Sequence, residues 1–474
     1  MGGRWAIAGI DLHVDVAGTR VSRSLEEALR AAVVDGRLAV GTRLPSSRTL
    51  AADLGISRNS VAQAYEQLTA EGWLDARVGA GTWVRERAAP PTGRVPAPAA
   101  TRPDLDLRAG VPDASAFPRQ AWAAAARRVL ARASVDALGY TDPRGVPALR
   151  QHMAAYLARA RGVRASAADV FVGHGFGDLL ALVCRALRAR GARLVAVEEY
   201  GHELHRRIVR AHGLQTVTLA IDDDGADVSR LEEAGADAVL LTPAHQFPTG
   251  VPLSAERRVR LVRWAERADA IVVEDDYDGE FRFDRRAVGA LQALAPERVL
   301  YAGTASKALA PAVGLAWAVA PPSLVPALVE ARETTGGGQD AVNQLTLAEF
   351  VGGHDYDRHV RRLRHLYRSR REAVEAAVAD RLPRCRVTGL PAGLHCLVEL
   401  PGGVREGDVV VEAARRGLAL EGLGAFAEGT VAPETSSARR PPSVVVGYGA
   451  PRPHRFGEAL AALVASVDAA SGRR

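Results

Sequence analysis

From residue 104 onward, short apolar runs alternate with amphipathic stretches, and this alternation restricts the fold more than any other feature. The apolar runs read as strands and lie at 170–172, 194–197, 238–241, 270–273, 299–301 and 315–319. Helical stretches separate most of them, for example 179–190, 203–211 and 254–266. Such alternation predicts a multi-domain chain whose 104–474 part is an α/β domain, a mostly parallel sheet covered by helices on both faces. The end, at about 380–474, is expected to form a smaller α+β lobe.

Residues 88–103 contain five prolines and almost no large apolar side chains, which is typical of an extended linker. Upstream, in residues 18–87, apolar side chains recur at helical spacing and predict three helices, at 24–34, 48–54 and 58–71. A hairpin of 73–77 and 82–85 follows. A generic three-helix bundle would share this pattern, but the order of elements favours a helix-turn-helix followed by a β wing.

The strings 41–48, 54–60, 64–68, 71–73 and 79–82 resemble the GntR family of winged-helix repressors, across the whole of this segment. The resemblance implies DNA contacts from the starts of the second and third helices and from the wing. These residues are Arg43, Ser46, Ser47, Arg48, Ser57, Arg58, Asn59, Ser60, Gly79, Gly81 and Thr82. The net charge of only +6 does not by itself indicate a nucleic-acid partner, so DNA binding depends on local placement.

Lys307 is the only lysine among the 61 Lys and Arg residues of the chain. Arginine stays protonated, whereas lysine can lose its proton in a suitable pocket and attack a carbonyl. One lysine could survive on the surface by chance. The apolar run 299–301 and the small residues before Lys307 instead favour a strand that ends in a ligand-facing turn.

Three polar stretches follow predicted strands, at the sheet edge where ligands bind in open α/β folds. They are the glycine turn 173–178, the acidic stretch 274–277 and the pair Ser306-Lys307. Taken singly, the first could be an ordinary turn and the second a helix cap or an ion-pair partner. A glycine turn, an aspartate and a lysine in this order are typical of a site for pyridoxal 5'-phosphate (PLP).

The strings 109–113, 142–145, 242–250, 274–278, 303–307 and 392–395 resemble the fold-type I aminotransferases. With the GntR-like segment in front, the chain resembles the MocR/GabR family of PLP-dependent regulators from about residue 20 to 465. The resemblance implies that Lys307 forms a Schiff base with PLP, that Asp275 pairs with the ring nitrogen and that Tyr277 lies near the ring hydroxyl. It also implies a phosphate site and a ring-stacking position, formed by Gly175, Phe176, Ser306 and His202.

The chain departs from this family pattern at several positions. Gly314 stands where an arginine is expected to hold the phosphate, and the loss of a charge-assisted contact predicts weak PLP binding. His202 and Val146 each replace an expected tyrosine. For the substrate carboxylate, the candidate arginines are Arg439 and Arg440. No metal site is predicted, because the pair His202 and His205 has no third ligand nearby.

We therefore expect a homodimeric, DNA-binding transcriptional regulator whose aminotransferase-like domain senses PLP or its adduct with an amine or amino-acid effector. Two alternatives remain open: an active PLP-dependent aminotransferase with a fused helical domain, and a PLP-free regulator with a degenerate scaffold. Whether residual transaminase chemistry persists also remains open. Three scattered cysteines, no signal peptide and no apolar run near the roughly 18 residues of a membrane span predict a cytoplasmic protein.

Overall fold

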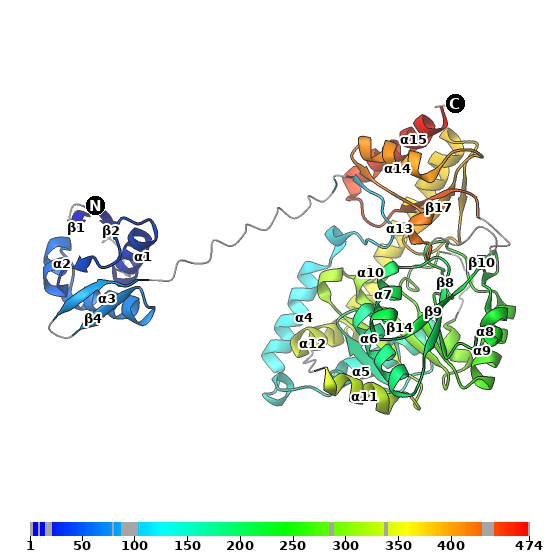
Figure 1. Cartoon of the computed structure of the whole chain (residues 1–474), viewed down its shortest axis with the longest axis horizontal. Helices are drawn as coiled ribbons and strands as arrows, with labels where there is room; N and C mark the ends of the chain where they lie inside the picture. Colours follow the sequence, from blue (N-terminus) through cyan, green and yellow to red (C-terminus); the bar gives the residue numbers. More distant parts are fainter. Residues whose placement is uncertain are drawn as a thin grey trace. The chain divides into compact units, whose positions relative to one another are not determined.

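The computed structural model describes residues 3–7, 10–14, 21–77, 80–86, 103, 105–283, 289–335, 340–428 and 440–472. The chain divides into two compact units, Met1–Thr101 and Arg102–Arg474 (Figure 1). All of the predicted linker except Pro103 lies outside the described residues. Among the described helices, none combines the length and the apolar character that crossing a bilayer requires.

The first unit is a winged helix-turn-helix. Its elements are a hairpin of β1 (Gly3–Ile7) and β2 (Ile10–Val14), the helices α1 (Val21–Val34), α2 (Ser47–Leu54) and α3 (Arg58–Ala70), and a sheet in the order β3 (Arg43–Leu44), β5 (Gly81–Val84), β4 (Leu74–Arg77). Leu25, Leu50 and Val61, one from each helix, meet in its buried core.

Local sequence signals explain where the two helices of the helix-turn-helix begin and end. The Ser46 hydroxyl accepts a hydrogen bond from the Thr49 N–H and caps α2. The helix stops at Gly55, whose φ of 66° is the left-handed conformation that glycine adopts without strain. The Ser57 hydroxyl then caps α3 by accepting from the Ser60 N–H.

The second unit is built on a mixed seven-stranded sheet with the order β7-β15-β14-β13-β12-β8-β9. The strands are β7 (Val170–Gly173), β8 (Leu194–Glu198), β9 (Gln215–Leu219), β12 (Ala238–Leu241), β13 (Ile271–Asp275), β14 (Val299–Thr304) and β15 (Ala316–Val319). All neighbouring pairs are parallel except those of β15, which is antiparallel to both β14 and β7. The predicted mostly parallel sheet is thus confirmed.

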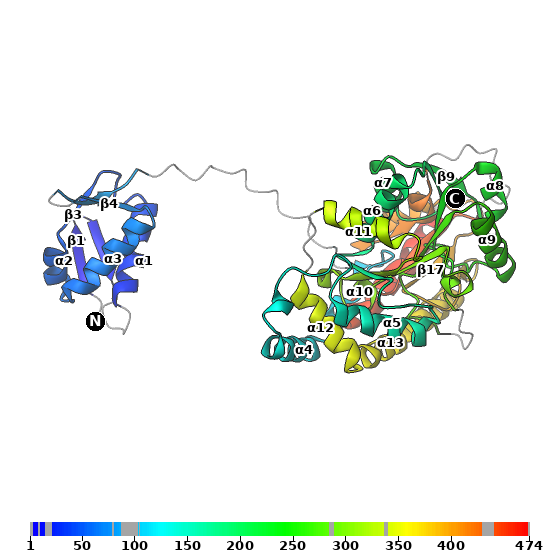
Figure 2. The same cartoon turned by 90° about the horizontal axis from the view of Figure 1, so that it is seen from below.

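Helices cover both faces of this sheet, because alternate residues of each buried strand point to opposite sides. Val195 and Val197 pack with α6 (Phe176–Ala189) and α11 (Val325–Thr334), whereas Ala196 packs on the other side with α9 (Ala255–Arg267). Other helices extend the second side near β7 and β15, namely α4 (Arg119–Arg132), α5 (Pro147–Arg161) and α12 (Ala341–Gly352). Figure 2 shows α4 beside α12.

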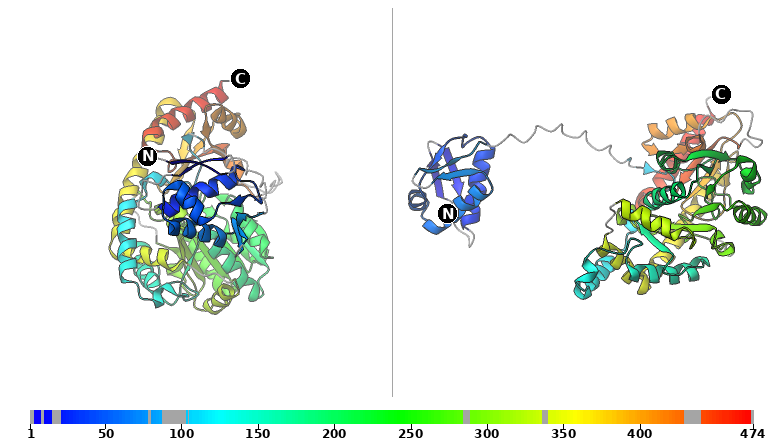
Figure 3. Two further views of the ribbon diagram at one scale, coloured as in Figure 1. Left: turned by 90° about the vertical axis from the view of Figure 1, so that its left-hand side faces the viewer. Right: turned by 60° about the horizontal axis from the view of Figure 1, so that its bottom comes forward.

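A smaller lobe carries an antiparallel sheet in the order β16-β17-β20-β19, and Figure 3 shows its orange and red elements together at one end of the unit. Its elements are β16 (Arg386–Thr388), β17 (His395–Glu399), β19 (Glu421–Gly422), β20 (Ser443–Gly447), α14 (Glu406–Arg415) and α15 (Phe456–Ser471). The lobe also takes in β6 (Leu105–Asp106), which pairs in parallel with β18 (Leu418–Ala419). The sequence did not predict that this early segment joins the lobe. The 27-residue helix α13 (Asp355–Arg381) contacts both α12 and α15.

Candidate functional site

A cavity of about 290 Å³ lies at the carboxyl ends of β8, β12 and β13. Ligands bind at this edge of open α/β sheets. Six residues that the sequence analysis assigned to a PLP site line the cavity: Phe176, His202, Asp275, Tyr277, Ser306 and Lys307. Gly175 directly precedes Phe176 as the N-cap of α6. The structure therefore gathers the predicted cofactor residues, which span more than a hundred positions of sequence, around one space.

Lys307 lies on the short helix α10 (Ala305–Ala308), which follows β14 directly. Its Nζ donates a hydrogen bond to the Gly110 carbonyl oxygen at 2.6 Å. Burial lowers the pKa of the Lys307 amine below its ordinary value, against the opposing charges of Asp275 and Asp278. A lowered pKa increases the neutral fraction of the amine, and the neutral amine is the form that attacks a carbonyl.

Asp275 ends β13 and is only 5% exposed. Its Oδ1 has no hydrogen-bond partner among the described residues, although Lys307 is near enough to lower its pKa. Burial is the larger effect and raises the pKa of Asp275 well above its ordinary value. A buried carboxylate with a free oxygen at the wall of a cavity is costly unless a ligand donates to it.

The start of α6 offers backbone N–H groups beside the cavity. Gly175 adopts φ 147° and ψ 171°, and no side chain caps the helix. On the facing turn, the Thr304 hydroxyl donates to Ser306 Oγ at 3.0 Å. An uncapped helix N-terminus next to hydroxyl groups is suited to an anion such as a phosphate. Gly314, where an arginine was expected, adds no charge there.

His202 precedes α7 (Glu203–Ala211), and its ring stacks with those of Phe247 and His205 at centroid distances of 6.0 and 5.1 Å. Burial, followed by the charges of Lys307 and Arg206, lowers the pKa of His202. The His202 imidazole is therefore mostly neutral at pH 7, and a neutral ring can stack on a flat ligand.

Two charged residues of the cavity wall were missed by the sequence analysis. Arg206 is 2% exposed, and its guanidinium donates to the carbonyls of Gly201 and Phe426. Burial raises the pKa of Glu198 to about 7, and this carboxyl accepts from the backbone and hydroxyl of Thr242. Arg206 has helical neighbours of mixed type, so no sequence signal separated it from surface arginines.

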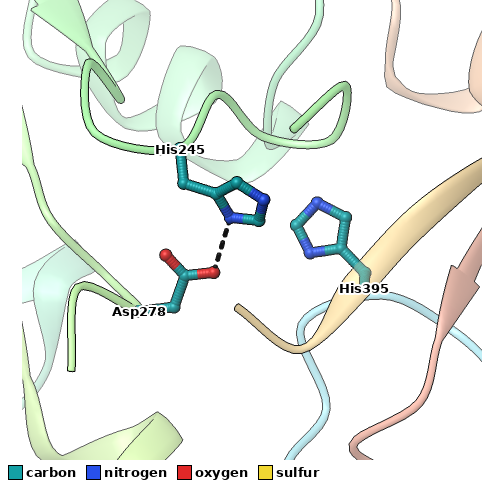
Figure 4. Close-up of side chains that lie close together, drawn as sticks. All are labelled: His245, Asp278 and His395. Carbon is teal, nitrogen blue, oxygen red and sulfur yellow. Dashed lines mark hydrogen bonds and ion pairs between the residues drawn. The ribbon is translucent and has the colours of Figure 1, made fainter. Parts of the chain in front are cut away.

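A buried cluster behind the cavity was also missed, and Figure 4 shows its three side chains. His245, Asp278 and His395 place ligand-type atoms within 4.8 Å of one another. His245 Nδ1 lies 2.8 Å from Asp278 Oδ2 and 3.1 Å from the Tyr277 hydroxyl. The cluster thus touches the cavity wall through Tyr277, and these contacts connect loops that are far apart in sequence.

Of the two candidate carboxylate arginines, only Arg440 is described, and it does not line the cavity. Arg440 Nη2 donates to the Asp222 carbonyl oxygen at 2.8 Å, and Arg440 is not among the cavity-lining residues. Arg439 lies outside the described residues.

In the first unit, the predicted DNA-contacting residues lie at the starts of α2 and α3 and on β3 and β5. Arg43, Arg48 and Arg58 are exposed, and none of the three forms an ion pair within the described part of the chain. A Cβ added to Gly81 would meet the Arg43 Nε at 2.9 Å, so Arg43 lies directly over the wing. Thr82 follows on β5, the remaining predicted residues flank the helix starts, and Gly79 lies outside the described residues. Free arginines around a helix-turn-helix suit a phosphate backbone.

Comparisons with known proteins agree with this two-unit organisation. Residues 21–84 match the gntR family of bacterial regulatory proteins, and residues 102–415 match the class I and II aminotransferases. The chain is similar to the HTH-type pyridoxine biosynthesis transcriptional regulator PdxR of Corynebacterium glutamicum, with 34% identity over 91% of this chain and 92% of that protein. It is also 34% identical to the probable rhizopine catabolism regulatory protein MocR of Rhizobium meliloti, over 77% and 78% of the two chains.

Among solved structures, the kynurenine aminotransferase of Pyrococcus horikoshii has the same fold as the second unit. The TM-score is 0.68, with 24% identity over 78% of this chain and 92% of that one. This likeness confirms the aminotransferase-like fold predicted for 104–474.

Proposed function

Because this chain belongs to the MocR-type transcriptional regulators, in which a GntR winged helix precedes an aminotransferase-like domain, we propose that its second unit binds PLP and an amine effector. The chain is a DNA-binding regulator, and the proposal concerns what it senses. One observation carries it: Lys307 and Asp275 face a single cavity whose wall includes the start of α6.

The residues present fit PLP at three points. When bound, PLP supplies a carbonyl that an amine attacks and a ring that withdraws electrons. The Asp275 Oδ1 without a partner suits a protonated ring nitrogen. Lys307, whose pKa is lowered by burial, suits the attacking amine, and the uncapped start of α6 suits the phosphate. An absorbance spectrum of the protein with added PLP tests the assignment.

We propose that PLP is held less firmly than in relatives with the expected arginine. Gly314 leaves the phosphate with backbone and hydroxyl donors, since no cation stands at this position. Losing one charge-assisted contact costs roughly 1.5–3 kcal/mol, or about tenfold to hundredfold in affinity. Purified protein is therefore expected to lose part of its cofactor.

The state of Lys307 would be communicated through Gly110. In this structure the Lys307 Nζ donates to the Gly110 carbonyl. Three residues earlier, the Leu107 backbone pairs with the smaller lobe: its N–H donates to the Ala419 carbonyl, and its carbonyl accepts from the Gly447 N–H. Displacement of Lys307 by an amine effector would leave the Lys307 Nζ free to hold the Gly110 carbonyl. Binding of the effector is thereby coupled to the segment that joins the lobe to the sheet.

The transaminase alternative requires an arginine for the substrate carboxylate. Arg440 is bound to the Asp222 carbonyl, and this placement does not favour that alternative. The other alternative, a regulator that does not bind PLP, predicts no change in the absorbance spectrum of the protein with added PLP.

Replacing Arg58 with alanine should weaken binding to a duplex selected from a random-sequence pool by roughly 1–3 kcal/mol and relax the preference at one base pair. Arg58 opens α3, is exposed and has no ion-pair partner in the described part of the unit. Arg48→Ala should weaken binding to all sequences similarly if it contacts phosphate. Fluorescence anisotropy at two salt concentrations measures both effects.

Arg23 on α1 provides the matched control for these substitutions. It is exposed but paired with Glu27, and it is not among the predicted contacts. Arg23→Ala should bind within about twofold of wild type. Wild-type affinity in both Arg58→Ala and Arg48→Ala would refute the assigned DNA surface.

We also propose that the second units pair as a homodimer. Four large apolar side chains at the end of α4 and in its connection to α5 are exposed in the single chain: Leu130 (57%), Val135 (87%), Leu138 (54%) and Tyr140 (105%). Exposed apolar patches of this kind mark protein contacts. Light scattering at micromolar concentration should give the mass of two chains, and Val135→Asp combined with Tyr140→Asp should shift it toward one. A monomeric wild type would contradict this proposal.

A further inference from the structure

Tyr277, on the cavity wall, belongs to a buried hydrogen-bonded chain that the family comparison does not explain. Its hydroxyl lies 3.1 Å from His245 Nδ1 and 3.2 Å from the His245 carbonyl oxygen. Asp278 Oδ2 lies 2.8 Å from the same Nδ1 (Figure 4). None of these three residues is more than 8% exposed. The hydrogen bonds of the Tyr277 hydroxyl are therefore determined by buried protein groups and not by solvent.

The hydrogen bond to Asp278 fixes the tautomer of His245. A carboxylate only accepts hydrogen bonds, so the proton of the imidazole must be on Nδ1. Because that Nδ1 is already a donor, it cannot accept from Tyr277. The Tyr277 hydroxyl is left with three acceptors for its proton: the neighbouring Asp278 carboxylate, the His245 carbonyl and any oxygen that a ligand presents in the cavity.

The Tyr277 hydroxyl keeps its proton in this environment. Burial, followed by the charges of Asp278 and Asp275, raises the pKa of Tyr277 well above its ordinary value, and a hydrogen bond with Asp278 and the charge of Glu198 add to this effect. The other titratable ring near it is His395, whose centroid lies 6.4 Å from that of Tyr277. Burial lowers the pKa of His395 to about 3, so His395 is neutral and adds no charge.

We propose that Asp278, acting through the tautomer of His245, is a positioning residue that keeps the Tyr277 hydroxyl available as a hydrogen-bond donor to an anionic oxygen of the ligand. The inference rests on the proposed PLP site, where the ring hydroxyl is such an oxygen. Without the Asp278 charge, the imidazole proton can move from Nδ1 to Nε2, so that Nδ1 accepts from Tyr277. The phenol would then turn its proton toward His245 and away from the cavity.

A metal ion is the other occupant that this cluster could hold. Among the described residues, neither ring nitrogen of His395 nor the Nε2 of His245 has a hydrogen-bond partner. However, an ion ligated by His245 Nδ1 and Asp278 Oδ2 would have to replace the hydrogen bond that already joins these two atoms at 2.8 Å. The existing bond thus favours the positioning role, and metal binding becomes an outcome of the test.

The test is Asp278→Asn in the full-length protein, with two readouts on added PLP. The affinity for PLP should fall about tenfold, because a hydrogen bond to a charged oxygen is lost. The pH at which the bound cofactor changes its absorbance should rise by about one unit. In the wild type, the Tyr277 hydroxyl stabilises the ring oxyanion most when the neighbouring Schiff-base nitrogen is deprotonated. Loss of this donor therefore favours the protonated nitrogen, and the pH of the absorbance change rises.

Tyr277→Phe separates positioning from a structural role. Asp278→Asn should have no further effect on either readout in the Tyr277→Phe background. Glu280→Gln is the matched control: Glu280 is a buried carboxyl two residues on that accepts from the Tyr356 hydroxyl instead, and its replacement should leave the absorbance transition unchanged. His245→Gln, which keeps a donor for Asp278, should retain most of the wild-type transition and serves if Asp278→Asn does not fold.

Four results would overturn the inference. The first is a wild-type transition and affinity in Asp278→Asn. The second is a shift by Asp278→Asn that persists in full without the Tyr277 hydroxyl. The third is stoichiometric uptake of Zn²⁺ or Co²⁺ that is lost on Asp278→Asn, which would assign the cluster to a metal. The fourth is a wild type that takes up no PLP at all, which would refute the proposed function together with this inference. The first two results would refute only the inference and would leave the proposed function standing.

Discussion

The Lys307→Arg protein will show no Schiff-base absorbance at saturating PLP and will carry no pyridoxyl group after borohydride reduction. Wild type will carry one, on the peptide that contains Lys307. The chain has no other lysine, and arginine keeps the charge but cannot form an imine. Absorbance spectra followed by peptide mapping measure the result. The N-terminal amine is the one other primary amine, and labelling confined to it would refute the assignment of Lys307.

Gly314→Arg provides the gain-of-function partner of this experiment. A Cβ at residue 314 would meet only the His174 carbonyl oxygen, at 3.7 Å, so there is room for a side chain. The φ of 62° imposes strain of order 1 kcal/mol on arginine. This strain is present with and without PLP, so a restored phosphate contact of roughly 1.5–3 kcal/mol should tighten PLP binding by about tenfold to hundredfold. Unchanged affinity would show that the phosphate does not lie beside residue 314.

The second large effect is expected at Asp275, where substitution by asparagine should raise stability without ligand and lower affinity for PLP. Asp275 is buried, its Oδ1 has no hydrogen-bond partner in the described part of the chain, and burial raises its pKa well above the ordinary value. Removing the charge relieves this cost. Breaking a buried ion pair with a ligand costs about 3–5 kcal/mol, so PLP affinity should fall by at least about a hundredfold.

The stabilisation should depend on pH in a definite direction. A carboxyl whose pKa is raised in the folded state contributes stability below its unfolded pKa and loses it as the pH rises through the folded value. Asp275→Asn removes this loss. Its melting temperature without PLP should therefore exceed that of wild type more at pH 8 than at pH 5, as measured by thermal melts at both pH values.

Asp276→Asn is the adjacent control with the opposite expected sign. Asp276 is bound by the Arg161 guanidinium at 2.7 Å and by the Tyr301 hydroxyl at 2.7 Å. Removing one partner of this buried pair should destabilise the protein by about 3–5 kcal/mol. If both substitutions lower the melting temperature equally, Asp275 is a structural residue and the proposed ring-nitrogen partner is wrong.

Much of the fold was predictable because the signals that define its elements are local. The predicted helix at 203–211 coincides with α7, and the helix expected at 48–54 begins one residue earlier, at Ser47. The serine caps and Gly55 mark these boundaries without help from tertiary contacts. The cofactor residues were predictable for a related reason, since in a parallel sheet the residues that follow each strand meet at one edge.

The remaining features depend on contacts between distant segments. The apolar run that became β15 is antiparallel between two strands, and nothing in its own residues indicates that direction. Leu105 pairs with Leu418 across more than three hundred positions. His245 and Asp278 lie in loops that follow strands of the seven-stranded sheet, and His395 lies on β17 of the smaller sheet. Each has an ordinary sequence context. Only the folded chain shows that Asp278 sets the tautomer of His245.

Helix α13 connects the lysine site to the smaller lobe. Near Lys307 it is held by a hydrogen bond from His359 Nε2 to the Ala308 carbonyl oxygen, at 2.7 Å. A few turns further, Arg371 donates to the carbonyls of Gly389 and Leu390 beside the smaller lobe. The two contacts are twelve residues apart, or about 18 Å along the helix, so a tilt of a few degrees at one displaces the other by about 1 Å. A movement at the single lysine would thus be carried along α13 to the smaller lobe.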